Sequence, residues 1–223
     1  DRLRSRGLGD VYKRQLSFTG WSMLGSMAGV GLIQGSAILL NIFFGPLVNA
    51  AFAIAISIYN ATLSLANSIV LAFRAPMIKA YAANEMKILD VMFGISNKCI
   101  LYLLSAITIP FFVEMEQVLT IWLGSPSVEV ITFARIILIY TVCLAISSPI
   151  TTIIQATGNV KFYYICTDSM TLMHLPLAYI MLRLGMPSYS VLLSMLSVII
   201  IAHIIRIVIL KRCLKSVSYT HLT

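Results

Sequence analysis

The chain carries little charge. Asp, Glu, Lys and Arg make up 11% of its 223 residues, whereas 59% are hydrophobic and the mean hydropathy is +0.94. Because about a quarter of the residues of a soluble domain are charged, this composition excludes an ordinary soluble core. The chain is instead expected to lie in a membrane.

The sequence also lacks the patterns that carry common chemistry. It has no His-Glu-x-x-His, no Gly-x-Ser-x-Gly and no phosphate-binding glycine-rich loop with a lysine. These absences argue against catalysis. The four cysteines have no Cys-x-x-Cys spacing and three lie in apolar stretches, so packing explains them better than disulfides or a metal. We therefore predict no enzyme activity, no metal site and no cofactor.

What the sequence does contain is six long apolar stretches. A spanning helix needs about 20 mainly apolar residues, and backbone groups without water must pair internally. The stretches are too long and too little alternated for barrel strands. We predict an all-α polytopic membrane protein, with one bundle of six transmembrane helices at about residues 17–43, 49–73, 89–113, 129–156, 161–184 and 187–210.

The connections between these helices are short. Gly45-Pro46, Gly158-Asn159 and Gly185-Met186-Pro187 are turn signals between consecutive spans. Between the third and fourth spans, residues 116–123 are expected to form a short interfacial helix anchored by Trp122. Between the second and third spans, residues 75–89 are expected to form a short amphipathic connector.

Both ends differ from this pattern. Residues 1–15 are polar and basic without helical periodicity, and residues 216–223 read SVSYTHLT. Both resemble translated sequencing-adapter read-through, so we exclude them from the functional interpretation. The expected domain is residues 16–215, as a piece of a larger gene product.

The positive charges are sorted between the two faces of the membrane. Arg135 and Arg183 fall on one side and Lys98 within a span, whereas the other side has eight: Arg74, Lys79, Lys87, Lys161, Arg206, Lys211, Arg212 and Lys215. The positive-inside rule places that side, and both ends of residues 16–215, in the cytoplasm. Five of the sixteen Lys and Arg residues lie in the first tail, so the basic balance does not indicate nucleic-acid binding.

The second span carries a polar stripe. Ser57, Asn60, Ser64 and Asn67, continued by Leu71 and Arg74, are spaced by three or four residues and share one helix face. One interpretation is hydrogen bonding between helices. The other is a water-lined cavity that binds substrate, with Arg74 at its cytoplasmic rim.

Asp168 lies on one face of the fifth span with Lys161, Tyr164 and Thr171. It is about 10 Å inside the membrane at 1.5 Å per residue. A carboxylate at this depth suggests a substrate or ion site, although pairing with Lys161 or Lys98 would also explain it. His174, six residues further on, is expected on another face.

Three further cations lie within spans. Lys98 and Arg135 either extend to the interface or line a pathway for an anionic head group. Arg206, together with His203, is expected to extend to the interface. In the first span, Gly25, Gly29, Gly31 and Gly35 favour either close packing of a neighbouring helix or a bendable helix.

Three stretches resemble a known family: residues 17–55, 73–85 and 153–185. They contain the Asn-x-x-x-Gly-Pro turn at 41–46, PMIKAYA at 76–82 and QATGNVK at 155–161. Together they resemble the polysaccharide flippases of the multidrug/oligosaccharidyl-lipid/polysaccharide exporter superfamily, especially O-antigen and capsule repeat-unit flippases.

The resemblance implies that the chain is the C-terminal lobe of a two-lobed transporter whose N-terminal lobe is missing here. Such transporters move undecaprenyl-pyrophosphate-linked oligosaccharides across the bacterial cytoplasmic membrane by alternating access. The expected partners are this lipid-linked oligosaccharide and membrane lipids. Two alternatives remain: a drug/cation antiporter of the related multidrug and toxic compound extrusion family, and a membrane polysaccharide polymerase or ligase.

Overall fold

The computed structural model describes the backbone of residues 2–157 and 160–219, and the side chains of residues 16, 19–23, 25–157 and 160–210. All regular structure in these ranges is helical. The helices are α1 (Arg2–Phe44), α2 (Pro46–Ala82), α3 (Met86–Val113), α4 (Met115–Leu123), α5 (Val128–Ile146), α6 (Ser148–Ala156), α7 (Lys161–Arg183) and α8 (Ser190–Tyr219).

Six segments are long and apolar enough to cross a membrane. They are Thr19–Phe44, Pro46–Ala82, Met86–Val113, Val128–Ala156, Lys161–Arg183 and Ser190–Leu210. Each coincides with one of the apolar stretches in the sequence. The protein is therefore an all-α polytopic membrane protein, as predicted.

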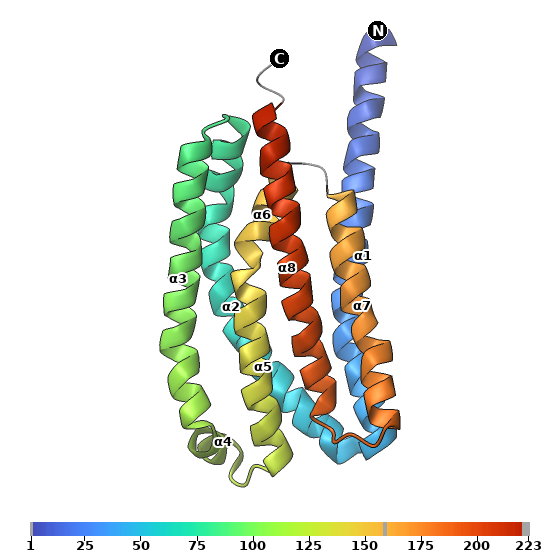
Figure 1. The fold of residues 1–223 in the computed structure, drawn as a ribbon, viewed down its shortest axis with the longest axis vertical. Coiled ribbons are helices and arrows are strands. Elements are labelled where there is room, and N and C mark those ends of the chain that lie inside the picture. Colours follow the sequence, from blue (N-terminus) through green and yellow to red (C-terminus); the bar gives the residue numbers. More distant parts are fainter. Residues whose placement is uncertain (1, 158–159, 220–223) are drawn as a thin grey trace.

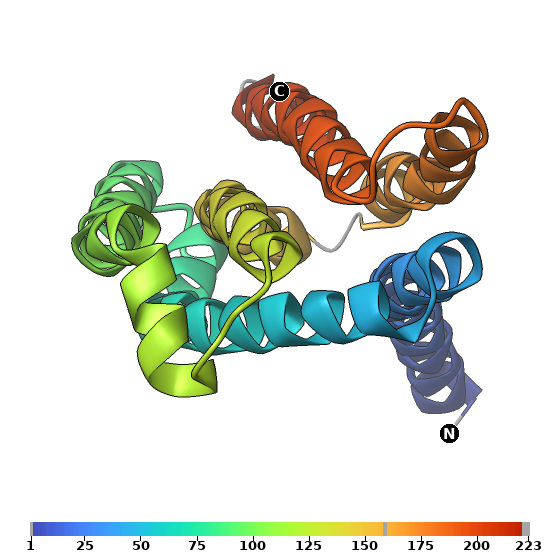
Figure 2. The same ribbon diagram turned by 90° about the horizontal axis from the view of Figure 1, so that it is seen from below.

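The long helices run along one axis, so the bundle has two distinct ends (Figure 1). We call the end at the top of Figure 1 the near end and the opposite end the far end. The near end carries the start of α1, the α2–α3 turn and the end of α8. The far end carries α4 and the α1–α2 and α7–α8 turns. Helix α2 crosses the bundle obliquely, from α1 at the far end to α3 at the near end (Figures 1 and 2). Helices α1 and α2 therefore meet at the far end and diverge toward the near end.

Two glycines make the sharp turns at the far end. Gly45 (φ 83°) is the single residue between α1 and α2, and Gly185 (φ 79°) follows α7. These torsions lie in the left-handed region that glycine adopts at little cost. Pro46 suits the first position of α2, where a backbone N–H has no intrahelical partner. Both turns were predicted, whereas Gly158 and Asn159 lie outside the described residues.

The prediction of a separate amphipathic connector at residues 75–89 is wrong, because most of this segment belongs to α2 and α3. Helix α2 continues through Pro76 to Ala82, and only a short turn with Asn84 at φ 59° separates it from α3. The helix persists because Met77 and Ala80 are buried in an apolar cluster with Ile153 and Ile154 of α6. This burial offsets the hydrogen bond lost at the proline.

The predicted fourth span is divided into α5 and α6 at Ser147. The Ser147 hydroxyl lies 2.6 Å from His203 Nδ1 on α8, which fixes the break against a neighbouring helix. The short helix expected at residues 116–123 is confirmed as α4. Its Met115 and Leu119 are buried and Trp122 is exposed.

Candidate functional site

The polar stripe of α2 lies on the surface of the bundle. Ser57, Asn60, Ser64 and Asn67 are all exposed, whereas Ala55, Thr62 and Ala66 on the opposite side of α2 are buried. The Ser57 hydroxyl donates to the Ala53 carbonyl of its own helix at 3.0 Å. None of the four side chains bonds to another helix within the described part of the chain. The stripe therefore does not hold this bundle together.

Helix α1 also exposes polar side chains, which the sequence analysis did not single out. Gln34 and Asn41 are seven residues apart, so they share one face, and both are exposed. Figure 2 shows α1 and α2 on the same side of the bundle. Two neighbouring helices thus present amides and hydroxyls outward at membrane depth.

Arg74 ends the stripe and begins a chain of hydrogen bonds. Its Nη2 donates to Gln155 Oε1 on α6 at 3.2 Å, and Gln155 Nε2 donates to the Tyr164 hydroxyl on α7 at 2.9 Å. Arg74 itself stays exposed. The amide thus orients one edge of the guanidinium and leaves other N–H groups for a ligand.

Glycine brings α1 against α7 beside this chain. A Cβ built on Gly25 would lie 3.0 Å from both Asp168 Oδ2 and the Tyr164 ring. Ten residues along α1, a Cβ on Gly35 would lie 2.5 Å from Leu175. Gly29, in contrast, faces open space. Two of the four glycines therefore permit the close approach that their spacing suggested.

Asp168 lies close to the hydrogen-bond chain of Arg74 but is not paired with a cation. The Thr167 hydroxyl lies 3.5 Å from Asp168 Oδ1, and the buried Oδ2 has no hydrogen-bond partner. Lys161 instead places its Nζ 5.4 Å from the centroid of the Trp21 ring. The suggested ion pair with Lys161 or Lys98 is not formed.

The prediction that Arg206 extends to the interface is wrong, because its side chain is buried in the bundle. The side chain is 9% exposed, and its Nε and Nη1 have no hydrogen-bond partner. Packing of α8 against α5 and α7 encloses it, which the sequence of one helix does not reveal.

His174 joins three helices. It is fully buried, with Nε2 2.8 Å from the Ser36 hydroxyl of α1 and Nδ1 2.8 Å from the Ser194 hydroxyl of α8. His174 is six residues from Asp168 and lies on another face of α7, as the helical spacing predicts. The partners were not foreseen, because they come from distant parts of the chain.

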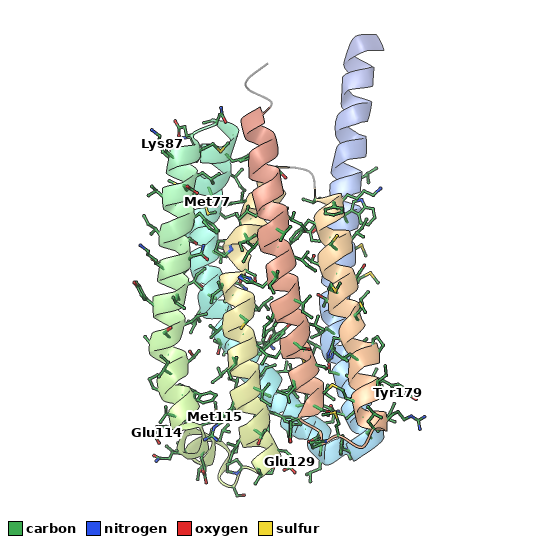
Figure 3. All side chains as sticks on the ribbon, viewed as in Figure 1. Met77, Lys87, Glu114, Met115, Glu129 and Tyr179 are labelled. Carbon is green, nitrogen blue, oxygen red and sulfur yellow. The ribbon has the colours of Figure 1, made fainter. Side chains whose placement is uncertain are left out.

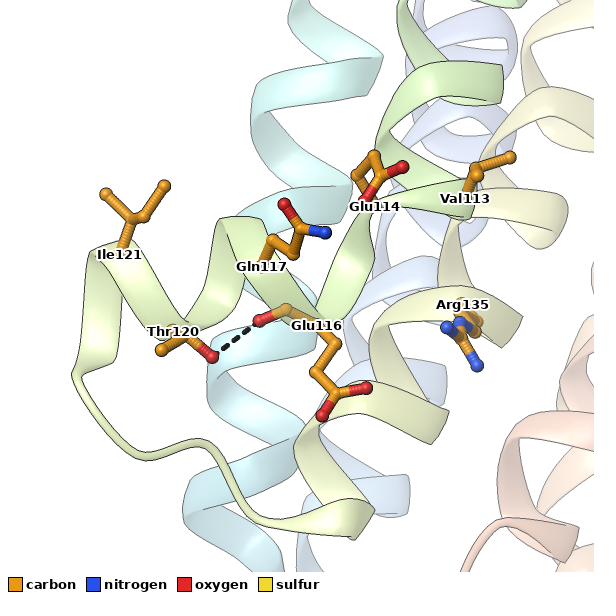
Figure 4. A pocket seen from close by; sticks show the side chains of 7 residues that line it. All are labelled: Val113, Glu114, Glu116, Gln117, Thr120, Ile121 and Arg135. Atoms are coloured by element: carbon orange, nitrogen blue, oxygen red, sulfur yellow. Dashed lines mark hydrogen bonds between the residues drawn. The ribbon is translucent and has the colours of Figure 1, made fainter.

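The other two predicted cations lie away from the stripe. Lys98 is exposed on α3, next to exposed Tyr102 one turn away. Arg135 on α5 lines a pocket of about 630 Å³ with Glu114, Glu116 and other residues of the α3–α4 region (Figure 4). The structure thus connects Arg74 through Gln155 to Tyr164, one helical turn from Asp168 on α7, whereas Lys98 and Arg135 belong to α3 and α5.

Metal ligands do not gather among the described side chains. No group of three or more His, Cys, Asp or Glu residues is arranged there to hold a metal ion. Cys99, Cys143 and Cys166 are free thiols.

These features define the class: a multi-pass, all-α membrane protein with polar side chains exposed on α1 and α2. Comparison of the chain with protein-family models, curated proteins and solved structures found no match.

Proposed function

We propose that this chain is one lobe of an alternating-access transporter that flips undecaprenyl-pyrophosphate-linked oligosaccharides across the bacterial cytoplasmic membrane. The observation that carries the proposal is the exposed stripe of α2, Ser57 to Asn67, which ends in Arg74. Polar side chains at this depth are costly against lipid tails. They need water or protein in front of them.

A second lobe of the same longer chain supplies that environment in our proposal. Helices α1 and α2 lie on one side of the bundle (Figure 2), and both expose polar side chains. A partner lobe facing them would enclose a polar cavity between the lobes. Because α1 and α2 diverge toward the near end, the cavity would widen there (Figure 1).

We assign the near end to the cytoplasm. Lys87 lies at this end, whereas Glu114 and Glu129 lie at the far end (Figure 3). Cytoplasmic loops are enriched in Lys and Arg. The cavity would therefore open toward the leaflet in which the cargo is made.

Arg74 is the group that we propose binds the pyrophosphate. A guanidinium offers a planar set of N–H donors that matches phosphate oxygens. Its bond to Gln155 holds the group in place, and Tyr164 holds Gln155. A positioned guanidinium loses less side-chain entropy when it binds an anion.

The direct test is transport by the full-length protein in vesicles, with a fluorescent lipid-linked oligosaccharide as cargo. We expect the label to become accessible in the opposite leaflet with wild-type protein. Replacement of Arg74 by Gln should slow this movement by about tenfold or more at equal protein level, because charge-assisted hydrogen bonds contribute roughly 1.5–3 kcal/mol. Full activity of Arg74→Gln would contradict the proposal.

Asp168 favours a second candidate, the drug/cation antiporter. Its buried Oδ2 has no hydrogen-bond partner, and a carboxylate oxygen in this state suits a proton or an organic cation. Export of cationic dyes that is lost in Asp168→Asn but kept in Arg74→Gln would favour the antiporter.

A further inference from the structure

We propose that α3, α4 and α5 form a binding site for one ethanolamine phospholipid at the far end of the bundle. No residue of the α2 stripe lines this site, and the site does not depend on the transport proposal. It joins a polar pocket, which takes the head group, to an apolar groove, which takes an acyl chain.

The polar pocket has a volume of about 630 Å³ and lies between α4 and the neighbouring ends of α3 and α5. Glu114 lies at the α3–α4 junction, Glu116 and Gln117 lie on α4, and Arg135 is contributed by α5 (Figure 4). A head group of a few polar atoms fits such a space. Charges of both signs line it.

These charges do not neutralise one another. None of the three charged side chains forms an ion pair or a hydrogen bond with a described residue. Arg135 Nε is buried without a partner, and the guanidinium carbon lies 5.8 Å from the centroid of the Phe112 ring. The Thr120 hydroxyl donates to the main-chain oxygen of Glu116 at 2.7 Å, which leaves the carboxylate free. The pocket thus contains one cation and two anions that form no ion pair or hydrogen bond with a described residue.

An ethanolamine head group has the complementary charges. Its phosphate accepts hydrogen bonds from a guanidinium, and its ammonium donates to carboxylates. Glycerol head groups offer no cation for Glu114 and Glu116. A choline head group has a cation but no N–H to donate. A lipid-linked pyrophosphate would bring further negative charge next to two carboxylates.

The apolar groove has a volume of about 310 Å³ and is lined by α3 residues 108–113 and α5 residues 138–143. Val113 lines both the groove and the polar pocket. Phe112, which lines the groove, also places its ring 5.8 Å from the guanidinium carbon of Arg135, measured to the ring centroid. The head-group pocket and the groove are therefore adjacent.

The groove leads in the direction that an acyl chain takes. Helix α5 enters the membrane from the far end, so Cys143 lies about 12 Å deeper than Arg135 at 1.5 Å per residue. Ile109 and Ile139 in the groove are 60% and 43% exposed, so lipid has access to it. The polar pocket lies at interfacial depth and the groove lies below it, as in a phospholipid.

Native mass spectrometry of the full-length protein in detergent tests the proposal. The probes are phosphatidylethanolamine, phosphatidylglycerol and phosphatidylcholine with identical acyl chains. We expect the first lipid bound to the wild type to favour ethanolamine over the other two by about tenfold, which corresponds to about 1.4 kcal/mol. Equal retention of the three lipids would overturn the proposal.

Variants separate the two charges. Arg135→Gln should weaken ethanolamine and glycerol lipids alike, because both lose the phosphate partner. The double variant Glu114→Gln/Glu116→Gln should still bind lipid but lose the preference for ethanolamine. Ile139→Trp should fill the groove and weaken all three lipids.

Matched controls carry the same charge changes at the same end of the bundle. Arg183→Gln on α7 and Glu129→Gln on α5 lie outside the pocket and should leave the preference unchanged. Circular dichroism identifies any variant that fails to fold, and Arg135→Lys then replaces Arg135→Gln as the milder change, with partial retention expected. Equal shifts in controls and pocket variants would overturn the proposal. So would tighter binding of a lipid-linked pyrophosphate than of phosphatidylethanolamine.

Discussion

Arg74 and Gln155 are 81 residues apart in the chain, yet Arg74 Nη2 lies 3.2 Å from Gln155 Oε1. This contact connects the exposed stripe of α2 to α6 and, through Tyr164, to α7. It makes the Arg74 guanidinium a positioned group rather than a free surface cation.

The first prediction concerns this positioned cation. In the full-length protein, Arg74→Gln should lower polysaccharide export by about tenfold or more, because charge-assisted hydrogen bonds contribute roughly 1.5–3 kcal/mol. Arg74→Lys should restore only part of the export, because an ammonium lacks the planar fork. Complementation of a flippase-deficient strain measures the effect. Lys87→Gln, also at the near end, serves as the control and should keep full export.

The second prediction concerns water along the stripe. In full-length protein without native cysteines, single cysteines at Ser57, Asn60, Ser64 and Asn67 should react with a membrane-impermeant thiol reagent. A cysteine at Ile109, which is 60% exposed on α3, should stay unlabelled because it faces lipid. Mass shifts of the purified protein measure labelling. If all four stripe positions are as protected as position 109, the stripe packs against protein instead.

The third prediction concerns orientation. A cysteine at Asn84, in the near-end α2–α3 turn, should react only after the cytoplasmic side is opened. A cysteine at Ser125, between α4 and α5 at the far end, should react in intact cells, because the positive-inside rule places the far end outside. Both positions are exposed, so burial does not confuse the comparison. The reverse pattern of labelling would show that the topology is inverted.

The fourth prediction concerns the contact of α1 with α7. Gly25→Ala should destabilise the protein by about 1–3 kcal/mol, the usual cost of overpacking. The new methyl group would meet Asp168 Oδ2 and the Tyr164 ring at 3.0 Å. Thermal unfolding in detergent should show a lower Tm. Gly29→Ala meets nothing within 4 Å, so its Tm should be unchanged or slightly higher.

The fifth prediction concerns the buried histidine. Ser36→Ala and Ser194→Ala should each cost about 1 kcal/mol, because each removes a hydrogen-bond partner of His174. The double variant should deviate from the sum, since both hydroxyls contact one imidazole ring. Thermal unfolding again gives the values. Additive losses would show that the two hydrogen bonds are independent.

The sequence predicted the spans well because the length and polarity of an apolar stretch are local properties. It also predicted the α2 stripe, since helical periodicity alone places Ser57, Asn60, Ser64 and Asn67 on one face. Each of these inferences needs only one segment of the chain.

Features that depend on two or more helices were missed. The continuation of α2 through Pro76 depends on burial of Met77 against α6, and the break at Ser147 is held by His203 of α8. Enclosure of Arg206 and the contacts of His174 likewise depend on packing partners distant in the sequence. No periodicity within one helix contains that information.

The single residue between α1 and α2 has a mechanical consequence. Helix α2 has 37 residues and follows directly after Gly45, which is the first residue beyond α1. At 1.5 Å per residue, α2 is a rod of about 55 Å. A rotation of about 10° at Gly45 would move its distant tip by about 10 Å on the same geometry. In the proposed transporter, small torsional changes at Gly45 would therefore be amplified into a large change in the width of the cavity at the near end.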